Sequence, residues 1–368
     1  MSPEHLPVLW IWGPPGVGKT TVGWEIRSEL AAAGITAGYV DIDQLGMSEP
    51  APADDPHRYR LKASNLAAVI PNYGAVGAQI LVVSGTGGIE QARTLAESPA
   101  VTLCRLRLDH DELRIRLSDR GWDPELVALA IAEATRLDAS TTADVVVDTT
   151  GLSVADVVRS LREQVGGWPR ARAATSLAAG GVSEMPGDIV WLCGPTGVGK
   201  SAVGWEIFAR AAWTDGRRAA LIDLQQIGFL APGSADDHRL RARNLAAMWS
   251  TIRADGTEFL VVVGAVDTHD QIRAYTDALP AAKFTLVRLQ AGRDQLAERI
   301  ARRGDGEGPR LPGDRLYGRD AAELALIADR AAADADRLAH ARIGEVVIDT
   351  DRLTVDETVV AVRRHIGQ

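Results

Sequence analysis

The chain has little cysteine and little lysine, and its N-terminal apolar run is short. The two cysteines of its 368 residues, Cys104 and Cys193, each lie in a strand-like apolar run, which excludes a disulfide framework and predicts buried free thiols. No lysine or arginine precedes the short run Val8–Trp12, so we expect a strand there and neither a signal peptide nor a membrane span. These absences predict a cytoplasmic protein with no membrane partner.

A basic block is also missing. The net charge of −9 is spread along the chain, which argues against nucleic-acid binding because such binding depends on clustered positive charge. Hydrophobic residues make up 46% and charged residues 24%, which is ordinary for a globular protein. The length of 368 residues predicts two domains of about 100–200 residues each.

The chain repeats itself. The sequence VLWIWGPPGVGKTTVGWEI at Val8–Ile26 matches IVWLCGPTGVGKSAVGWEI at Ile189–Ile207. The match continues to the last strand of each half. We therefore predict a tandem repeat of one domain, residues 1–165 and 189–368. A flexible linker rich in Gly, Ala, Ser and Pro, residues 166–188, would join the copies. The second copy has about twenty extra residues near 305–320, predicted to be a longer loop.

Each copy has the pattern of an α/β domain. Short Val/Ile/Leu runs alternate with helix-like stretches such as Thr20–Ala33 and Asp109–Arg120. Apolar strands of this kind are buried on both faces, and their alternation with helices indicates parallel strands joined by right-handed crossovers. Two three-layer α/β/α domains with mainly parallel sheets follow from this pattern.

Both copies contain a G-x-x-x-x-G-K-[ST] phosphate loop (P-loop) between an apolar strand and a helix. Its backbone amides would surround the β-phosphate of ATP, Lys19 and Lys200 would reach the β- and γ-phosphates, and Thr20 and Ser201 would bind Mg²⁺. The predicted nucleotide-binding residues are Gly13, Pro14, Pro15, Gly16, Val17, Gly18, Lys19, Thr20 and Thr21, and Gly194, Pro195, Thr196, Gly197, Val198, Gly199, Lys200, Ser201 and Ala202. An accidental glycine-rich turn is the alternative. It is disfavoured because the loops occupy equivalent positions and hold two of the four lysines.

An acidic motif follows the first P-loop helix. The strand ends in Tyr39-Val-Asp41-Ile-Asp43, with Asp41 22 positions after Lys19. From the P-loop through this D-x-D motif to the closing strand and helix, each copy resembles the nucleoside and small-molecule kinase branch of P-loop proteins, such as adenylylsulfate, gluconate and shikimate kinases. The resemblance implies a P-loop NTPase fold in both copies.

The same resemblance implies roles for the acidic residues. Asp41, and Asp223 in the second copy, would hold Mg²⁺ or orient the acceptor hydroxyl, and Asp43 would contact the substrate or act as its general base. The alternative for Asp41 is that it only caps the next turn. Gln225 stands in the place of Asp43 in the second copy. Because glutamine cannot accept a proton, we expect the first copy to be the catalytic one.

Two pairs of arginines align in the helix that would carry the lid. Arg116 and Arg120 correspond to Arg299 and Arg303. In kinases of this type such arginines neutralise charge on the transferring phosphoryl group, so the resemblance assigns Arg116 and Arg120 to catalysis. A solvated helix face is the alternative.

Two further pairs are candidates for binding the acceptor substrate. Lys62 aligns with Arg241, and Asn65 aligns with Asn244 in a chain that contains only three asparagines. The alternative for the asparagines is helix capping or packing.

The predicted function is ATP-dependent phosphoryl transfer to a hydroxyl of a small metabolite, with the first copy catalytic. The alternative is an ATP-binding regulatory or scaffolding protein in which one or both copies are inactive. The alternative arises because the third strand of the first copy, Ile80–Ser84, ends without the acidic pair of a motor ATPase. The pattern leaves the acceptor and the oligomeric state open.

Overall fold

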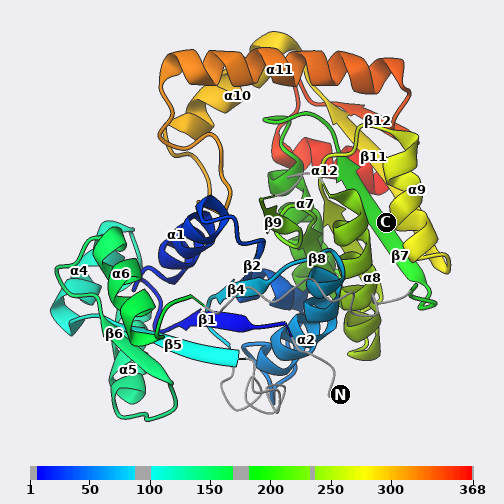
Figure 1. Cartoon of the computed structure of the whole chain (residues 1–368). Coiled ribbons are helices and arrows are strands. Elements are labelled where there is room, and N and C mark those ends of the chain that lie inside the picture. Colours follow the sequence, from blue (N-terminus) through cyan, green and yellow to red (C-terminus); the bar gives the residue numbers. More distant parts are fainter. Residues whose placement is uncertain (1–5, 88–100, 169–181, 233–236, 367–368) are drawn as a thin grey trace. The chain divides into compact units, whose positions relative to one another are not determined.

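The structure, a computed structural model, describes residues 6–87, 101–168, 182–232 and 237–366 (Figure 1). The chain divides into two compact units, each built from one half and a short segment of the other half. Unit 1 takes its described residues from Met1–Gly46, Arg58–Gly180 and Gly228–Leu240, and unit 2 from Met47–His57, Gly181–Ile227 and Arg241–Gln368. Most of the predicted linker, residues 169–181, lies outside the described residues.

Unit 1 is a sheet with the strand order β6-β5-β1-β4-β2-β9, in which every pairing is parallel except that of β9 with β2. Its strands are β1 (Val8–Trp12), β2 (Ala37–Asp41), β4 (Ile80–Ser84), β5 (Val101–Arg107), β6 (Val145–Asp148) and β9 (Phe229–Ala231). Its helices are α1 (Lys19–Ala32), the 3₁₀ helix η1 (Ile42–Gly46), α2 (Tyr59–Ala75), α4 (His110–Asp119), α5 (Pro124–Asp138) and α6 (Val154–Gln164).

Neighbouring residues of β2 show that helices cover both faces of this sheet. A methyl group on Gly38 would lie 2.6 Å from the ring of Tyr73 on α2, whereas one on Gly23 of α1 would lie 3.2 Å from the ring of Tyr39. Because successive side chains of a strand point to opposite faces, α1 and α2 lie on opposite sides of the sheet. The central strands β1, β2 and β4 are buried along their whole length, as their continuous apolar runs predicted.

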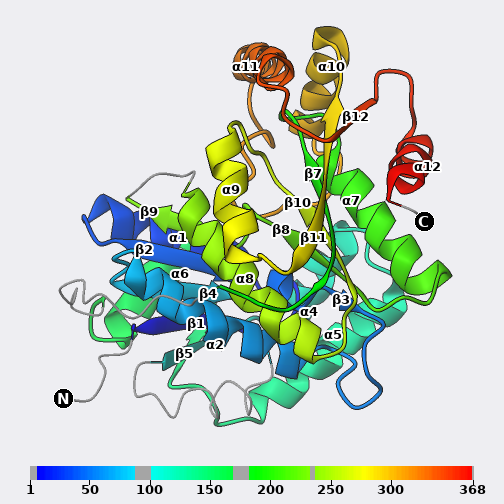
Figure 2. The same cartoon turned by 90° about the vertical axis from the view of Figure 1, so that its right-hand side faces the viewer.

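Unit 2 has the corresponding strand order, β12-β11-β7-β10-β8-β3, again with one antiparallel edge strand (Figure 2). Its strands are β3 (Ser48–Glu49), β7 (Gly187–Cys193), β8 (Ala219–Asp223), β10 (Phe259–Val263), β11 (Ala282–Gln290) and β12 (Val346–Asp349). Its helices are α7 (Lys200–Ala209), the π-helix η2 (Arg210–Thr214), α8 (His238–Ala254, whose first turn belongs to unit 1), α9 (His269–Ala278), α10 (Arg293–Gly304), α11 (Ala321–His340) and α12 (Val355–His365). The α/β class with mainly parallel sheets is confirmed for both units.

The edge strand of each sheet comes from the other half of the sequence. In unit 1, Phe229 of β9 pairs with Tyr39 and packs its ring 4.9 Å from that of Trp24, measured between centroids. In unit 2, β3 pairs with β8, and the hydroxyls of Ser48 and Thr257 are 3.0 Å apart. The compact units therefore differ from the contiguous domains 1–165 and 189–368 at two short segments.

Other expectations concern the thiols and the membrane. Cys104 and Cys193 are buried free cysteines, as predicted, and burial raises the pKa of both thiols to about 12. Within the described part of the chain, none of the helices combines the length and the apolar character needed to cross a bilayer.

Candidate active site

The first P-loop joins β1 to α1 and depends on glycines with left-handed backbone. Gly13 has φ 144°, and a Cβ at this position would lie 2.5 Å from the carbonyl oxygen of Leu106 on β5. Gly18, with φ 99°, is the N-cap of α1 and offers no side chain to cap the helix. The first amides of α1 are therefore left without a side-chain acceptor, which is the geometry that binds an anion.

Lys19 is buried at the start of α1. Its Nζ donates to the carbonyl oxygen of Pro14 at 2.8 Å, so the ammonium lies across the loop. Burial lowers the pKa of Lys19 to about 8, against the opposing effects of Asp43 and Asp41. A buried ammonium that is neutralised only in part is suited to receive phosphate charge.

The second P-loop has the same geometry in unit 2. Gly194, Gly197 and Gly199 have φ values of 137°, 81° and 103°. Lys200 Nζ donates to the carbonyl oxygens of Gly194 at 2.9 Å and Pro195 at 2.8 Å, and burial lowers the pKa of Lys200. Each of the two predicted loops thus has the backbone of an anion-binding loop.

Asp41 ends β2 directly beside the first P-loop. Its Oδ2 accepts a hydrogen bond from Thr20 Oγ1 at 3.3 Å, and its Oδ1 accepts one from the Asp43 amide at 3.0 Å. Burial, with a smaller contribution from the charge of Asp43, raises the pKa of Asp41 to about 6. The bond to the Asp43 amide is the turn cap that the sequence left as the alternative, and the bond from Thr20 also places Asp41 at the loop. In unit 2, burial likewise raises the pKa of Asp223. The backbone amide of Gln225 donates to Asp223 Oδ1 at 2.9 Å.

Asp43 lies on η1 and remains open to solvent, with 50% of its side chain exposed. The Nζ of Lys62, from α2, is 2.6 Å from Asp43 Oδ1 and also donates to the Thr86 carbonyl oxygen at 3.3 Å. Lys62 is therefore an ion-pair partner of the proposed base, a placement that its alignment with Arg241 did not indicate. Its predicted contact with the acceptor stays a prediction.

Thr20 and Asp41 fit a magnesium ion. A hydroxyl and a carboxylate are the hard oxygen donors that Mg²⁺ prefers, and a cation would neutralise the buried Asp41. Among the described residues there is no group of three His, Cys, Asp or Glu that could hold a metal. A magnesium ion bound at a P-loop would take its remaining ligands from phosphate and water. The equivalent residues in unit 2 are Ser201 and Asp223.

The four predicted lid arginines differ in what they contact. Arg116 pairs with Glu112 on its own helix, α4. Arg120 follows α4, is exposed, and lies close enough to Lys19 for its charge to help lower the lysine pKa. Arg299 donates to the carbonyl oxygen of Val198 in the second P-loop at 3.0 Å and to the Thr350 carbonyl at 2.7 Å. Arg303 contacts the loop that follows α10.

Asn65 and Asn244 are fully buried and bind the main chain. Asn65 Nδ2 donates to the Leu45 carbonyl at 2.6 Å, and Asn244 Nδ2 donates to the Ile227 carbonyl at 2.7 Å. Each ties a long helix to the turn after the acidic strand, which corresponds to the packing alternative. Their predicted role in binding the acceptor stays untested.

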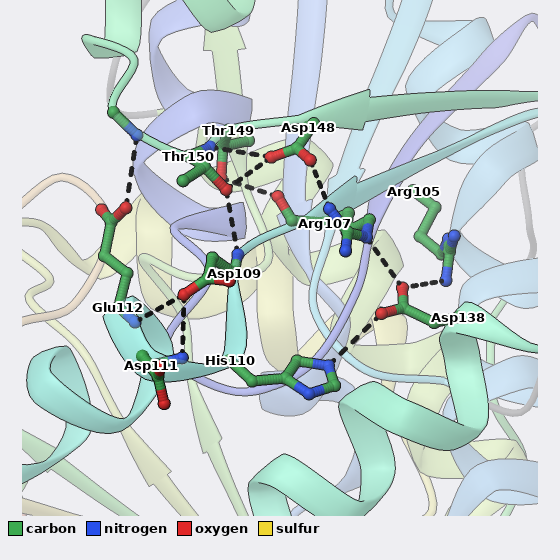
Figure 3. Close-up of polar contacts among 11 residues, drawn as sticks. Arg105, Arg107, Asp109, His110, Asp111, Glu112, Asp138, Asp148, Thr149 and Thr150 are labelled. Carbon is green, nitrogen blue, oxygen red and sulfur yellow. Dashed lines mark hydrogen bonds and ion pairs between the residues drawn. The ribbon is translucent and has the colours of Figure 1, made fainter.

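A charged network behind the first P-loop was missed from the sequence (Figure 3). Two arginines and a histidine lie around Asp138 of α5, with Arg105 Nη1 at 3.1 Å, Arg107 Nε at 3.3 Å and His110 Nε2 at 3.3 Å from its carboxylate. Arg107 also pairs with Asp148. Leu106, between the two arginines, is the residue against which Gly13 packs. The network thus fixes the strand that supports the loop. The alternation of arginines along β5 was the available signal.

Comparisons with known proteins give likenesses of fold only. No known protein family and no curated protein sequence matches the chain. Its structure is similar to those of a gluconokinase from Sinorhizobium meliloti 1021 (19% identity, 44% of this chain and 93% of that chain, TM-score 0.34) and a sugar kinase from Janibacter sp. HTCC2649 (16%, 45% and 98%, 0.35). A shikimate kinase from Bacteroides thetaiotaomicron is also similar (16%, 44% and 98%, 0.30). Each match spans less than half of this chain.

The raised pKa of Asp41 predicts a pH-dependent effect of Asp41→Asn on stability. The pKa of about 6 means that the folded state holds this proton more tightly than the unfolded chain does. The resulting stabilisation is present below pH 4 and is lost as the pH rises through 6. In the nucleotide-free protein, asparagine avoids this loss, so the variant should gain about 2 kcal/mol relative to wild type between pH 4.5 and 7.5.

Urea unfolding of both proteins at the two pH values measures this gain. The exposed carboxylate of Asp119 on α4 provides a matched control, Asp119→Asn, which should show no such pH dependence. A difference between Asp41→Asn and wild type that stays constant with pH would contradict the burial of an ionised Asp41.

Proposed function

We propose that unit 1 transfers the γ-phosphoryl group of ATP to a hydroxyl group of a small metabolite. The observation that supports this most directly is the pair of carboxylates after β2. Asp41 is buried and contacts Thr20 of the P-loop, whereas Asp43, two residues later, is half exposed and faces solvent. Asp41 is thus placed to help bind a metal ion beside the phosphates, and Asp43 is accessible to an acceptor.

The residues of unit 1 divide the chemistry among them. The P-loop amides and Lys19 hold the phosphates, and bound Mg²⁺ would supply further positive charge to the phosphate oxygens through Thr20 and Asp41. Asp43 accepts the hydroxyl proton as the acceptor oxygen attacks the γ-phosphorus and the bond to ADP breaks. The ammonium of Lys62, 2.6 Å away, orients the Asp43 carboxylate. Since Asp43 is exposed, the proton can pass to water afterwards.

Nucleotide binding without transfer is a second candidate function, and it is favoured by unit 2. Gln225 stands in the place of Asp43 and cannot act as a base. The central strands β4 and β10 end in Ser84 and Val263, without an acidic residue to activate water. The presence of Gln225 and the lack of an acidic residue at these strand ends are both consistent with one catalytic unit and one unit that only binds nucleotide.

An ADP-release assay on the full chain tests the proposed function. The full chain is required because each half supplies an edge strand to the other unit. Sugars, nucleosides and aminocyclitols are offered with Mg-ATP, and we expect at least one of them to stimulate ADP release. Asp41→Asn should lower turnover more than nucleotide affinity. Tight ATP binding with no stimulation by any acceptor would favour the second candidate, and an equal loss of turnover and affinity would count against a catalytic role of Asp41.

A further inference from the structure

The loop between α10 and α11 in unit 2, residues 305–320, is far longer than its counterpart in unit 1. There, only residues 120–123 separate α4 from α5, and all of them are exposed. We call residues 305–320 the inserted loop. Its sequence, rich in Gly, Pro and Arg, predicts irregular backbone, and the structure shows neither helix nor strand within it.

The inserted loop is nevertheless packed in place. Leu316 is 8% exposed and belongs to the hydrophobic core of unit 2. Arg303 of α10 forms an ion pair with Asp314 at 2.7 Å and also donates to the carbonyl oxygens of Glu307 and Pro309. Asp314 in turn accepts from the Leu316 amide at 2.9 Å. A buried apolar anchor and a paired charge hold the segment on the unit.

The inserted loop is hydrogen-bonded to the residues that follow strand β8, which ends in Asp223. Gln225 Nε2 donates to the Gly313 carbonyl at 3.4 Å, and Gln226 Nε2 donates to the Pro312 carbonyl at 3.1 Å. Gln226 is 3% exposed, and Pro312 is buried. The loop therefore covers the turn that begins two residues after Asp223.

The corresponding residue of unit 1 is exposed among the residues that the structure describes. Asp43, which Gln225 replaces, exposes half of its side chain to solvent, whereas Gln225 is partly buried under the inserted loop. Arg303 forms an ion pair with Asp314 of the inserted loop, and Arg299 donates hydrogen bonds to the carbonyl oxygens of Val198 and Thr350. The groups that would meet an acceptor and a transferring phosphoryl group in unit 1 are thus engaged within the protein in unit 2.

We infer that unit 2 binds a nucleoside triphosphate at Gly194–Ser201 and takes no acceptor, because the inserted loop occupies the position that an acceptor would fill beside β8. This inference rests on the proposed function for the location of the acceptor in unit 1. The second P-loop keeps its anion-binding backbone, with glycines of positive φ and with Lys200 donating to the carbonyl oxygens of Gly194 and Pro195. Unit 2 is then a site that holds nucleotide without transferring phosphate.

The rate at which a cysteine at position 225 is modified tests whether the inserted loop covers this position. The acceptor need not be known for this experiment. Gln225→Cys is made in the full chain and treated with a thiol reagent; the native Cys104 and Cys193 are 0% exposed and react slowly. Adding Asp314→Ala, which removes the carboxylate that pairs with Arg303 and so loosens the inserted loop, should speed modification of position 225 at least about tenfold. Asp305→Ala is the matched control, since Asp305 is an exposed carboxylate of the same loop and should leave the rate unchanged.

Nucleotide counting completes the test. Equilibrium dialysis of the full chain with a non-hydrolysable Mg-ATP analogue should give two bound nucleotides in wild type and one in Lys200→Ala. Fast modification of Gln225→Cys with the loop intact, or two nucleotides bound to Lys200→Ala, would overturn the inference. If wild type releases no ADP with any acceptor while both results above hold, the proposed function of unit 1 fails and the nucleotide site of unit 2 stands.

Discussion

Lys19→Ala is expected to lower acceptor-stimulated ADP release by at least about 10²-fold, because it removes the one ammonium that lies across the P-loop of unit 1. One of the bound nucleotides should also be lost. Since the lysine is buried at a cost that lowers its pKa to about 8, its removal should not destabilise the nucleotide-free protein. Steady-state kinetics, equilibrium dialysis and thermal unfolding together measure these three effects.

The scarcity of lysine provides the control for this experiment. Lys283, an exposed residue of β11, is the one lysine of the chain outside the P-loops and the Asp43 ion pair, and Lys283→Ala should retain wild-type turnover and binding. If Lys19→Ala kept its acceptor-stimulated turnover, phosphoryl transfer would have to occur elsewhere. Unfolding of the variant at a markedly lower temperature would instead mean that Lys19 supports the fold, contrary to the cost of burying its ammonium.

Asp43→Asn is expected to lower turnover by about 10²- to 10⁴-fold, the range lost with a general base, and to leave nucleotide affinity within about twofold. The change keeps the size of the side chain, and the carboxylate of Asp43 is paired with Lys62 of α2. Binding of ATP should therefore persist without transfer. The variant gives unit 1 a side-chain amide at the position where unit 2 has that of Gln225.

Initial rates at saturating ATP, together with calorimetric titration of Mg-ATP, separate the two effects of Asp43→Asn. Asp119→Asn is again the matched control, because it removes an exposed carboxylate from α4 at no cost to the site. Undiminished turnover in Asp43→Asn would remove Asp43 from the mechanism. A parallel loss of ATP affinity would show that this carboxylate serves the nucleotide and not the acceptor.

The contact between Lys62 and Asp43 shows where alignment of the two halves stops being informative. Alignment pairs Lys62 with Arg241 and suggests one role for both. In the structure, Lys62 is bound to a carboxylate that the second half lacks, whereas Arg241 contributes its charge to the environment of Asp223. The change from Asp43 to Gln225 thus goes together with a change in its basic partner. The repeated sequence preserves the framework of the two units and not this ion pair.

The sequence by itself determined the local features of both units. Each P-loop needs glycines at fixed positions, a lysine and a hydroxyl, and these follow one another along the chain, so the pattern predicted their geometry. The helix expected at Thr20–Ala33 is α1 at Lys19–Ala32, and that expected at Asp109–Arg120 is α4 at His110–Asp119. The structure places Asp41 at the end of β2 next to Thr20 of the P-loop, and the pattern indicated this location because the carboxyl ends of parallel strands share one edge of the sheet. Its role at that edge stays a prediction.

Tertiary structure alone decided which sheet receives each edge strand. An edge strand is held largely by backbone hydrogen bonds, which carry little sequence information, so the short sequences of β3 and β9 do not name their partner strands. The same holds for Asp138, whose three nitrogen partners come from β5 and the start of α4. It also holds for the inserted loop, whose residues contact Gln225 and Gln226 across more than 80 positions of the chain. Contacts of that kind depend on packing that no local pattern records.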